Sequence, residues 1–135
     1  MDAAQALADL TEISSQIEAA VLFDAAGAVE GSTLADEANA QGLAEAASRL
    51  LERAGTVRNE DVAVMQVEAA LAEGCVFVVR DGDRRIAATT VANPTVGLVF
   101  YDLKSCLRDS AGDGDEAEKP KRKRTTKSKD DDREA

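Results

Sequence analysis

The sequence of 135 residues contains no histidine and no tryptophan, and only one tyrosine and three phenylalanines. Without histidine, there is no imidazole for catalysis, for metal binding or for a pH switch. With so few aromatic side chains, we do not expect a stacking platform for single-stranded nucleic acid. The two cysteines, Cys75 and Cys106, follow neither a CxxC nor a zinc-ligand spacing. We therefore expect reduced thiols, no metal site and no cofactor.

Long hydrophobic runs are also missing, since no apolar stretch approaches the roughly 18 residues that span a bilayer. The first ten residues carry no positive charge and no signal-peptide core, so we expect a cytoplasmic protein. No GxxxxGK[ST] motif or glycine-rich dinucleotide fingerprint occurs. Asp24 and the Asp81-Gly82-Asp83 sequence are better explained as turns than as a catalytic acid or a calcium loop. The sequence therefore predicts no enzyme.

The net charge of −10 is distributed unevenly along the chain. Residues 1–107 hold 17 acidic and 7 basic residues, whereas residues 108–135 hold nine of each. The last leucine is Leu107, and the segment after it has too little apolar surface to offset the entropy of ordering. We predict a folded domain over residues 1–107 and a disordered charged tail over 108–135.

A basic block lies within this tail, at residues 119–129, where seven of eleven residues are Lys or Arg. Acidic residues on both sides make a solvated, solubilising segment one interpretation. The other interpretation is an electrostatic patch for weak binding of nucleic acid, anionic membrane or an acidic protein. The residues of this patch are Lys121, Arg122, Lys123, Arg124, Lys127 and Lys129.

Hydrophobic periodicity predicts three helices and five strands. The helices are expected over 2–15, over 35–54 after a Thr33–Asp36 capping box, and from Asn93-Pro94 to Leu107. The strands are expected over residues 17–23, 28–32, 62–68, 75–79 and 85–91, with turns at 24–27 and 80–84. The order α-β-β-α-β-β-β-α indicates an α+β fold.

Three stretches of this pattern resemble the roadblock/dynein-light-chain family of LC7 type. They are VLFDAAGAVEGSTL (21–34), LAEAASRLLERA (43–54) and CVFVVRDGDRRIAATTVANPTVGLVFYDLKSCL (75–107), and the resemblance covers about residues 4–107. It implies a five-stranded antiparallel sheet with the long middle helix on one face and the terminal helices on the other. It also implies homodimers or heterodimers that act as non-catalytic regulators or scaffolds for Ras-like small GTPases.

The residues themselves suggest where such a dimer would form. Small residues on the second helix permit close helix approach, and the strand over 62–68 is a candidate sheet edge that pairing would protect. The predicted dimer or partner interface consists of Ala46, Leu50, Arg53, Ala54, Val62, Val64 and Gln66. The alternative is that these residues only pack in the protein's own core. Arg49 and Arg53 are better explained by charge pairing at the helix end, with Glu45 beside Arg49, than as arginine fingers.

Three functions remain open at this stage. The first is a dimeric roadblock-type regulator of a small GTPase or a related signalling complex. The second is a dimeric body whose basic tail tethers nucleic acid or an anionic membrane. The third is a profilin-like sensor domain for a small ligand, although no convergent set of polar residues marks a pocket.

Overall fold

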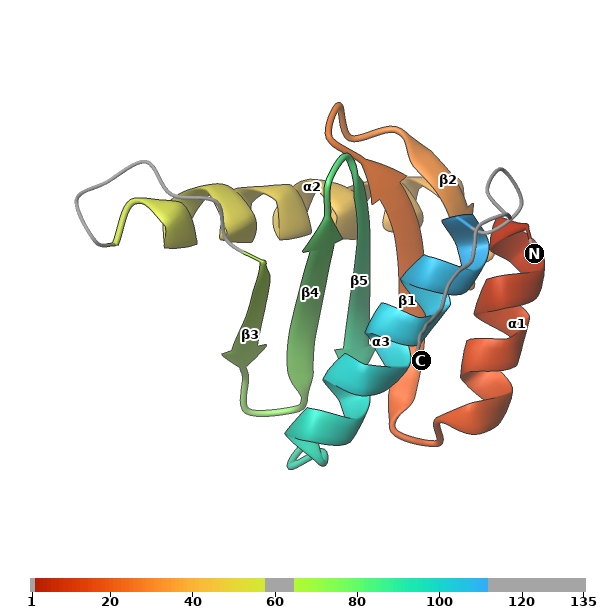
Figure 1. Ribbon diagram of the computed structural model, residues 1–135. Coiled ribbons are helices and arrows are strands. Elements are labelled where there is room, and N and C mark those ends of the chain that lie inside the picture. The colour runs from red at the N-terminus through yellow and green to blue at the C-terminus, as the bar shows by residue number, and fades with distance from the viewer. Residues whose placement is uncertain (1, 58–64, 112–135) are drawn as a thin grey trace, which may run out of the picture.

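The computed structural model describes residues 2–57 and 65–111 (Figure 1). Its elements follow the predicted order: α1 (Ala3–Ile13), β1 (Ile17–Asp24), β2 (Val29–Ser32), α2 (Glu37–Gly55), β3 (Gln66–Ala70), β4 (Cys75–Asp81), β5 (Arg84–Thr90) and α3 (Val96–Ala111). The strands form one antiparallel sheet in the order β2-β1-β5-β4-β3. The predicted α+β fold with a five-stranded antiparallel sheet is confirmed.

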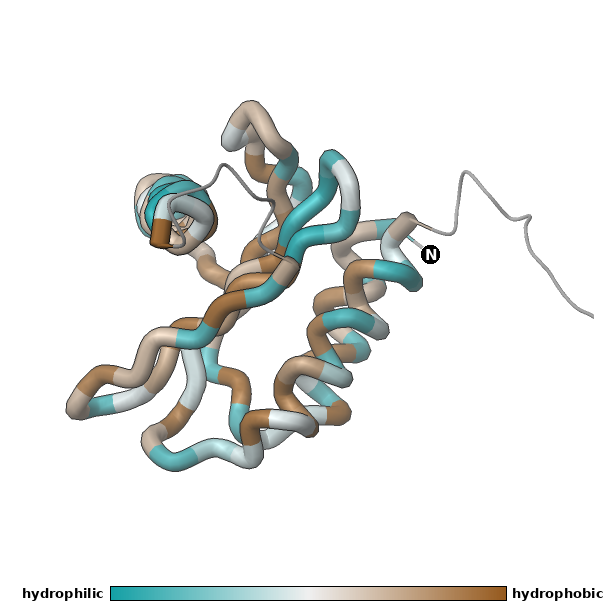
Figure 2. Tube along the Cα trace, turned by 60° about the vertical axis from the view of Figure 1, so that its left-hand side comes forward, coloured by the Kyte–Doolittle hydropathy of each residue, from teal (hydrophilic) through white to brown (hydrophobic). Residues whose placement is uncertain are grey.

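The sheet separates two hydrophobic clusters, because successive side chains of a strand point to opposite faces. Phe77 and Val79 of β4 pack with α1 and α3 on one face, and Val78 packs with α2 on the other. Figures 1 and 2 show this arrangement, with α2 alone on one side of the sheet and α1 and α3 together on the other. The predicted layering is therefore confirmed, and β4 lies inside the sheet between β5 and β3.

The turn between β1 and β2 confirms the structural interpretation of Asp24. Its Oδ1 atom accepts hydrogen bonds from the backbone N–H groups of Ala26 and Ala28, each at 2.9 Å. Gly27 adopts φ +89°, a left-handed conformation that glycine reaches without steric cost. Because its carboxylate is occupied by the turn, Asp24 has a local structural role.

Two predicted helix starts are wrong. Asp36, not Thr33, caps α2, and its side chain accepts the N–H of Ala38 at 2.8 Å. Thr33 instead accepts the N–H of Ala20 through its Oγ1 at 2.9 Å, which ties the β2 end to β1. Asn93 has φ +57° and lies outside the last helix, which begins at Val96.

Two predicted element ends also differ. The strand expected over 62–68 is described as β3 over Gln66–Ala70, and residues 62–64 lie outside the described residues. The last helix does not end at Leu107 but continues to Ala111. Ser110 is buried in this extra turn, and its hydroxyl donates to the carbonyl of Leu107 at 2.9 Å.

This extra turn leads to a prediction about where the chain can be shortened. A chain ending after Leu107 should have a free energy of unfolding about 1–2 kcal/mol below that of the full chain, because the last turn and its buried hydrogen bond are lost. A chain ending after Ala111 should match the full chain within about 0.5 kcal/mol. Urea unfolding followed by circular dichroism checks both. Equal stability of the two shortened chains would contradict the role of the last turn.

Candidate protein-interaction interface

Helix α2 packs on the sheet through one narrow stripe of mainly small residues. Ala40, Ala44, Ala47 and Leu51 are buried and follow the three- and four-residue spacing of a single helix face. They contact the cluster that includes Val78 and the α2-side residues of β1. The small side chains bring the helix close to the sheet and leave its other faces accessible.

The predicted interface residues of α2 lie outside this stripe. Ala46 and Arg53 are exposed, and Leu50 and Ala54 are half-buried. Ala46, Leu50 and Ala54 are spaced four residues apart, so they follow one flank of the helix. Leu50 also packs partly against the sheet cluster. The exposure of Ala46 and Arg53 means that they do not serve the protein's own core.

Strand β3 lies at the edge of the sheet, as predicted. Within the described residues it pairs only with β4, so its other edge presents backbone groups that a second strand can pair with. Gln66, the predicted interface residue in this strand, is exposed, and Val67 is half-buried toward α2. Val62 and Val64 lie outside the described residues.

The α2 side of the sheet is only partly covered. Helix α2 crosses it near the upper ends of β3 and β4, and among the described residues no helix lies over the lower ends of these strands on this side (Figures 1 and 2). A cavity of about 440 Å³ opens in this region, at the turn between β3 and β4. Its lining consists of Glu18, Leu71, Ala72, Glu73, Gly74, Cys75, Val76, Thr89 and Thr90. We call this uncovered region the shelf.

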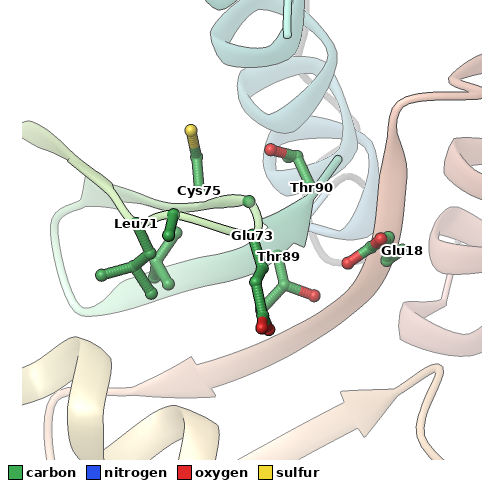
Figure 3. A pocket seen from close by; sticks show the side chains of 9 residues that line it. Glu18, Leu71, Glu73, Cys75, Thr89 and Thr90 are labelled. Atoms are coloured by element: carbon green, nitrogen blue, oxygen red, sulfur yellow. The ribbon is translucent and has the colours of Figure 1, made fainter. Parts of the chain in front are cut away.

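Figure 3 shows which side chains give the shelf its character. Glu18, Glu73 and Thr89 project to the side of the sheet on which α2 lies, whereas Cys75 and Thr90 project to the other side. Leu71 is 64% exposed at the turn. The shelf therefore combines an exposed apolar side chain with two carboxylates.

Sequence reasoning did not identify the shelf. One available signal was Glu18, a charged residue in a strand whose other residues are nearly all buried. Glu73 gave no such signal, because acidic residues are common in turns. The position of α2, which decides that this part of the sheet stays uncovered, is not visible in the sequence.

The described residues offer little for catalysis. Both cysteines are buried, and burial raises the pKa of the Cys106 thiol to about 12. The negative charges of Asp109 and Asp9 also raise this pKa, and the positive charge of Arg84 lowers it. The Cys106 thiol donates to the carbonyl of Ala6 at 3.4 Å. A thiol in this state is not a nucleophile at neutral pH.

Other chemistry-bearing groups also have structural surroundings. Burial raises the pKa of the Asp102 carboxyl in α3. Within residues 2–57 and 65–111, no three Cys, Asp or Glu side chains lie close enough together to hold a metal ion. Arg84 forms an ion pair with Glu30 at 2.8 Å and donates to the carbonyl of Leu107 at 3.1 Å, which joins the sheet to α3. The expected pairing of Glu45 with Arg49 is not formed, although both residues are described.

Two further results concern regions beyond this interface. In the part of the chain that the structure describes, no helix is long and apolar enough to cross a membrane. The residues of the predicted tail patch, from Lys121 to Lys129, lie outside the described residues, so binding by the tail stays a prediction.

Comparison with solved structures decides the fold. A roadblock/LC7 domain from Streptomyces avermitilis superposes with a TM-score of 0.72 at 20% identity, over 82% of this chain and 96% of that domain. The chain has a roadblock-type fold. The gliding protein MglB from Thermus thermophilus matches with a TM-score of 0.61 at 15% identity, over 81% of this chain and 85% of that protein. MglB from Myxococcus xanthus matches with a TM-score of 0.58 at 12% identity, over 79% and 86%.

The roadblock-type fold confirms the resemblance found in the sequence. No family model and no curated protein matches the sequence itself. The likeness is therefore carried by the three-dimensional arrangement of the sheet and helices. Among the similar structures, another MglB structure is described as having a tetrameric arrangement.

Proposed function

We propose that this chain is a non-enzymatic regulator or scaffold that forms a roadblock-type dimer in the cytoplasm and binds a small Ras-like GTPase. The observation that carries the proposal is the outer edge of β3, which has no partner strand among the described residues and lies beside the exposed flank of α2. An uncovered edge strand tends to pair with another chain, and a small-residue helix flank permits a second helix to approach closely. The roadblock-type fold supports the same interpretation.

The geometry of the proposed dimer follows from the edge strand. Two β3 strands that pair antiparallel about a two-fold axis join both sheets into one of ten strands. Because each α2 lies on the same face of its own sheet, both helices then lie on one face of the joined sheet. Ala46, Leu50 and Ala54 of each helix would contact the partner helix.

The proposed action on a GTPase does not require a catalytic group from this chain. Arg49 and Arg53 are the two basic residues of α2, and both are exposed. In a dimer, both arginines would lie near the two-fold axis, where contact with the second copy is a simpler role than catalysis on a GTPase. We therefore expect the dimer to act by binding and reshaping its partner, and not by an inserted arginine.

The proposal predicts a large effect of Leu50→Glu on assembly. A carboxylate in the centre of the helix contact should raise the Kd of the dimer at least about 100-fold, equivalent to about 2.7 kcal/mol. Size-exclusion chromatography with light scattering should show a dimer for the natural chain at tens of micromolar and a monomer for the variant. Ile13→Glu is the matched control, because Ile13 is 72% exposed on α1, on the opposite side of the sheet.

The GTPase part of the proposal needs its own measurement. Purified full-length chain should retain a Ras-like GTPase from lysate loaded with GDP or with a GTP analogue, and mass spectrometry identifies the retained protein. The Leu50→Glu variant should retain at least about tenfold less, and the Ile13→Glu control should retain as much as the natural chain. A natural chain that stays monomeric contradicts the dimer, and a dimer that retains no GTPase in either state contradicts the partner.

A further inference from the structure

The shelf is a surface without an occupant within the described chain. It has a cavity of about 440 Å³, an exposed leucine at Leu71, and carboxylates at Glu73 and Glu18. Those carboxylates project to the same side of the sheet as α2 (Figure 3). A matching occupant would carry an apolar side chain and a positive charge.

Helix α2 is longer than the sheet is wide. Its 19 residues span about 28 Å at about 1.5 Å per residue. Five strands with neighbours about 4.8 Å apart are about 19 Å wide. Leu51 is the last large residue of α2 that is buried on the sheet cluster, which also includes Val67 of β3. The chain from Glu52 to Val57 therefore projects past the edge strand, as the left-hand end of α2 does in Figure 1. We call residues 52–57 the overhang.

The overhang carries an exposed apolar side chain and a positive charge, the two features that a matching occupant of the shelf needs. Val57 is 77% exposed, and Arg53 is exposed in the last turn of the helix. Neither has a described apolar or acidic partner on the overhang's own side of β3. The apolar side chain and the positive charge thus belong to the same chain as the shelf, but they lie beyond the opposite side of its edge strand.

A two-fold axis brings these parts together. Consider a rotation by 180° about an axis that is normal to the sheet and lies just outside β3, between the two paired β3 strands. In the view of Figure 1, this rotation exchanges upper with lower and left with right. The overhang lies beyond β3 and near its upper end, so after rotation it lies over β3 and β4 of the other copy near their lower ends. The shelf is located at that place, on the same face of the sheet (Figures 1 and 2).

We propose that the shelf is the seat for the overhang of a second copy of this chain, with Val57 on Leu71 and Arg53 facing Glu73. This inference rests on the proposed dimer, and it favours a homodimer over a heterodimer. Shelf and overhang are complementary within one sequence, so a single gene product supplies both halves of two equivalent contacts. Glu18, farther along the shelf, adds to the negative potential that attracts Arg53.

A disulfide test addresses the contact directly. Full-length Val57→Cys and full-length Leu71→Cys, carrying tags of different size, are mixed and oxidised mildly. A covalent heterodimer should form in high yield, because the two new thiols can meet only between subunits. Ile13→Cys replaces Leu71→Cys in the control mixture, since Ile13 is at least as exposed as Leu71 but lies on α1, on the other side of the sheet. This control should give at least about tenfold less cross-linked product.

A charge-exchange test addresses the specificity of the contact. Glu73→Arg and Arg53→Glu, each alone, should raise the dimer Kd about fivefold, and the double variant should return to within about twofold of the natural value. Glu12→Arg on α1 makes the same charge change on the other side of the sheet and should leave the Kd unchanged within about twofold.

The outcomes separate this inference from the proposed dimer. A natural chain that dimerises, with no selective cross-link and no rescue by charge exchange, overturns the seat and leaves the dimer standing. A natural chain that stays monomeric at tens of micromolar overturns both. Selective cross-linking with rescue supports the seat, and a dimer that forms only with a different roadblock chain contradicts the homodimer.

Discussion

Replacing Phe77 by alanine should lower the free energy of unfolding by about 3–5 kcal/mol. Phe77 lies in β4, inside the sheet, and its side chain is completely buried between the sheet and α3. Its ring meets that of Phe100 edge-on, with centroids 4.9 Å apart and planes at 74°. Such an aromatic pair adds about 0.5–1.5 kcal/mol to the burial itself. A domain of this size has only about 5–15 kcal/mol of stability, so much of it would be lost.

Urea unfolding monitored by circular dichroism measures this loss. Tyr101→Ala is the matched control, because Tyr101 is the aromatic neighbour of Phe100 but is 65% exposed. It should change the free energy of unfolding by no more than about 0.5 kcal/mol. Equal losses for the two variants would show that Phe77 is not the centre of the α1–α3 cluster.

The burial of Phe77 was predictable because strand alternation depends on local geometry. Side chains of a strand alternate between its faces, so a strand of nearly continuous apolar residues is expected to be buried on both sides, and β1 and β4 are buried in this way. The order of elements follows from the hydrophobic pattern, and the edge position of β3 is suggested by its place after the long helix, whereas the layers are implied by the family resemblance.

The capping errors have a different cause. Thr33 and Asp36 have the side chains of a capping box, but the hydroxyl of Thr33 is used by the backbone of Ala20 in β1. Asn93 is a common cap residue, but the chain at Thr95 is held by Gln16, whose side-chain oxygen accepts the N–H of Thr95 at 2.6 Å. Both competing contacts join residues far apart in the sequence. Local signals cannot reveal them.

The candidate interface was predicted only in part, because it too depends on contacts that local sequence signals do not reveal. Small-residue spacing selected α2, but it did not separate the buried stripe from the exposed flank, because alanine occurs on both. Ala46 and Ala47 are adjacent in sequence, and only Ala47 is buried. The overhang and the shelf depend on the length of α2 relative to the width of the sheet. To know that ratio, one must know how many strands lie beneath the helix and in which order, and only the tertiary structure shows this.

The turn beside the shelf gives the second large effect, in the variant Gly74→Ala. A Cβ atom at Gly74 would collide with the backbone carbonyl oxygen of Thr90 on β5. Backbone cannot rotate away as a flexible side chain can, so β4 and β5 would have to separate at this end. We expect the free energy of unfolding to fall by about 2–3 kcal/mol. Thermal unfolding followed by circular dichroism measures this change.

Gly42→Ala is the matched control, because a Cβ atom there meets nothing within 4 Å and the residue lies inside α2. This variant should gain about 0.5–1 kcal/mol, since alanine is a better helix former than glycine. A loss in both variants would point to a general intolerance of the fold and not to the close approach at Gly74.

The same substitution also links the fold to the proposed dimer. Gly74 closes the turn between β3 and β4, because its carbonyl oxygen accepts a hydrogen bond from the N–H of Leu71 at 2.8 Å. Leu71 and Glu73 are the shelf residues assigned to the overhang, so a displaced turn should weaken dimerisation as well as stability. Gly74→Ala should therefore raise the dimer Kd about tenfold under conditions where the variant is still folded. An unchanged Kd with the expected stability loss would place the dimer contact away from this turn.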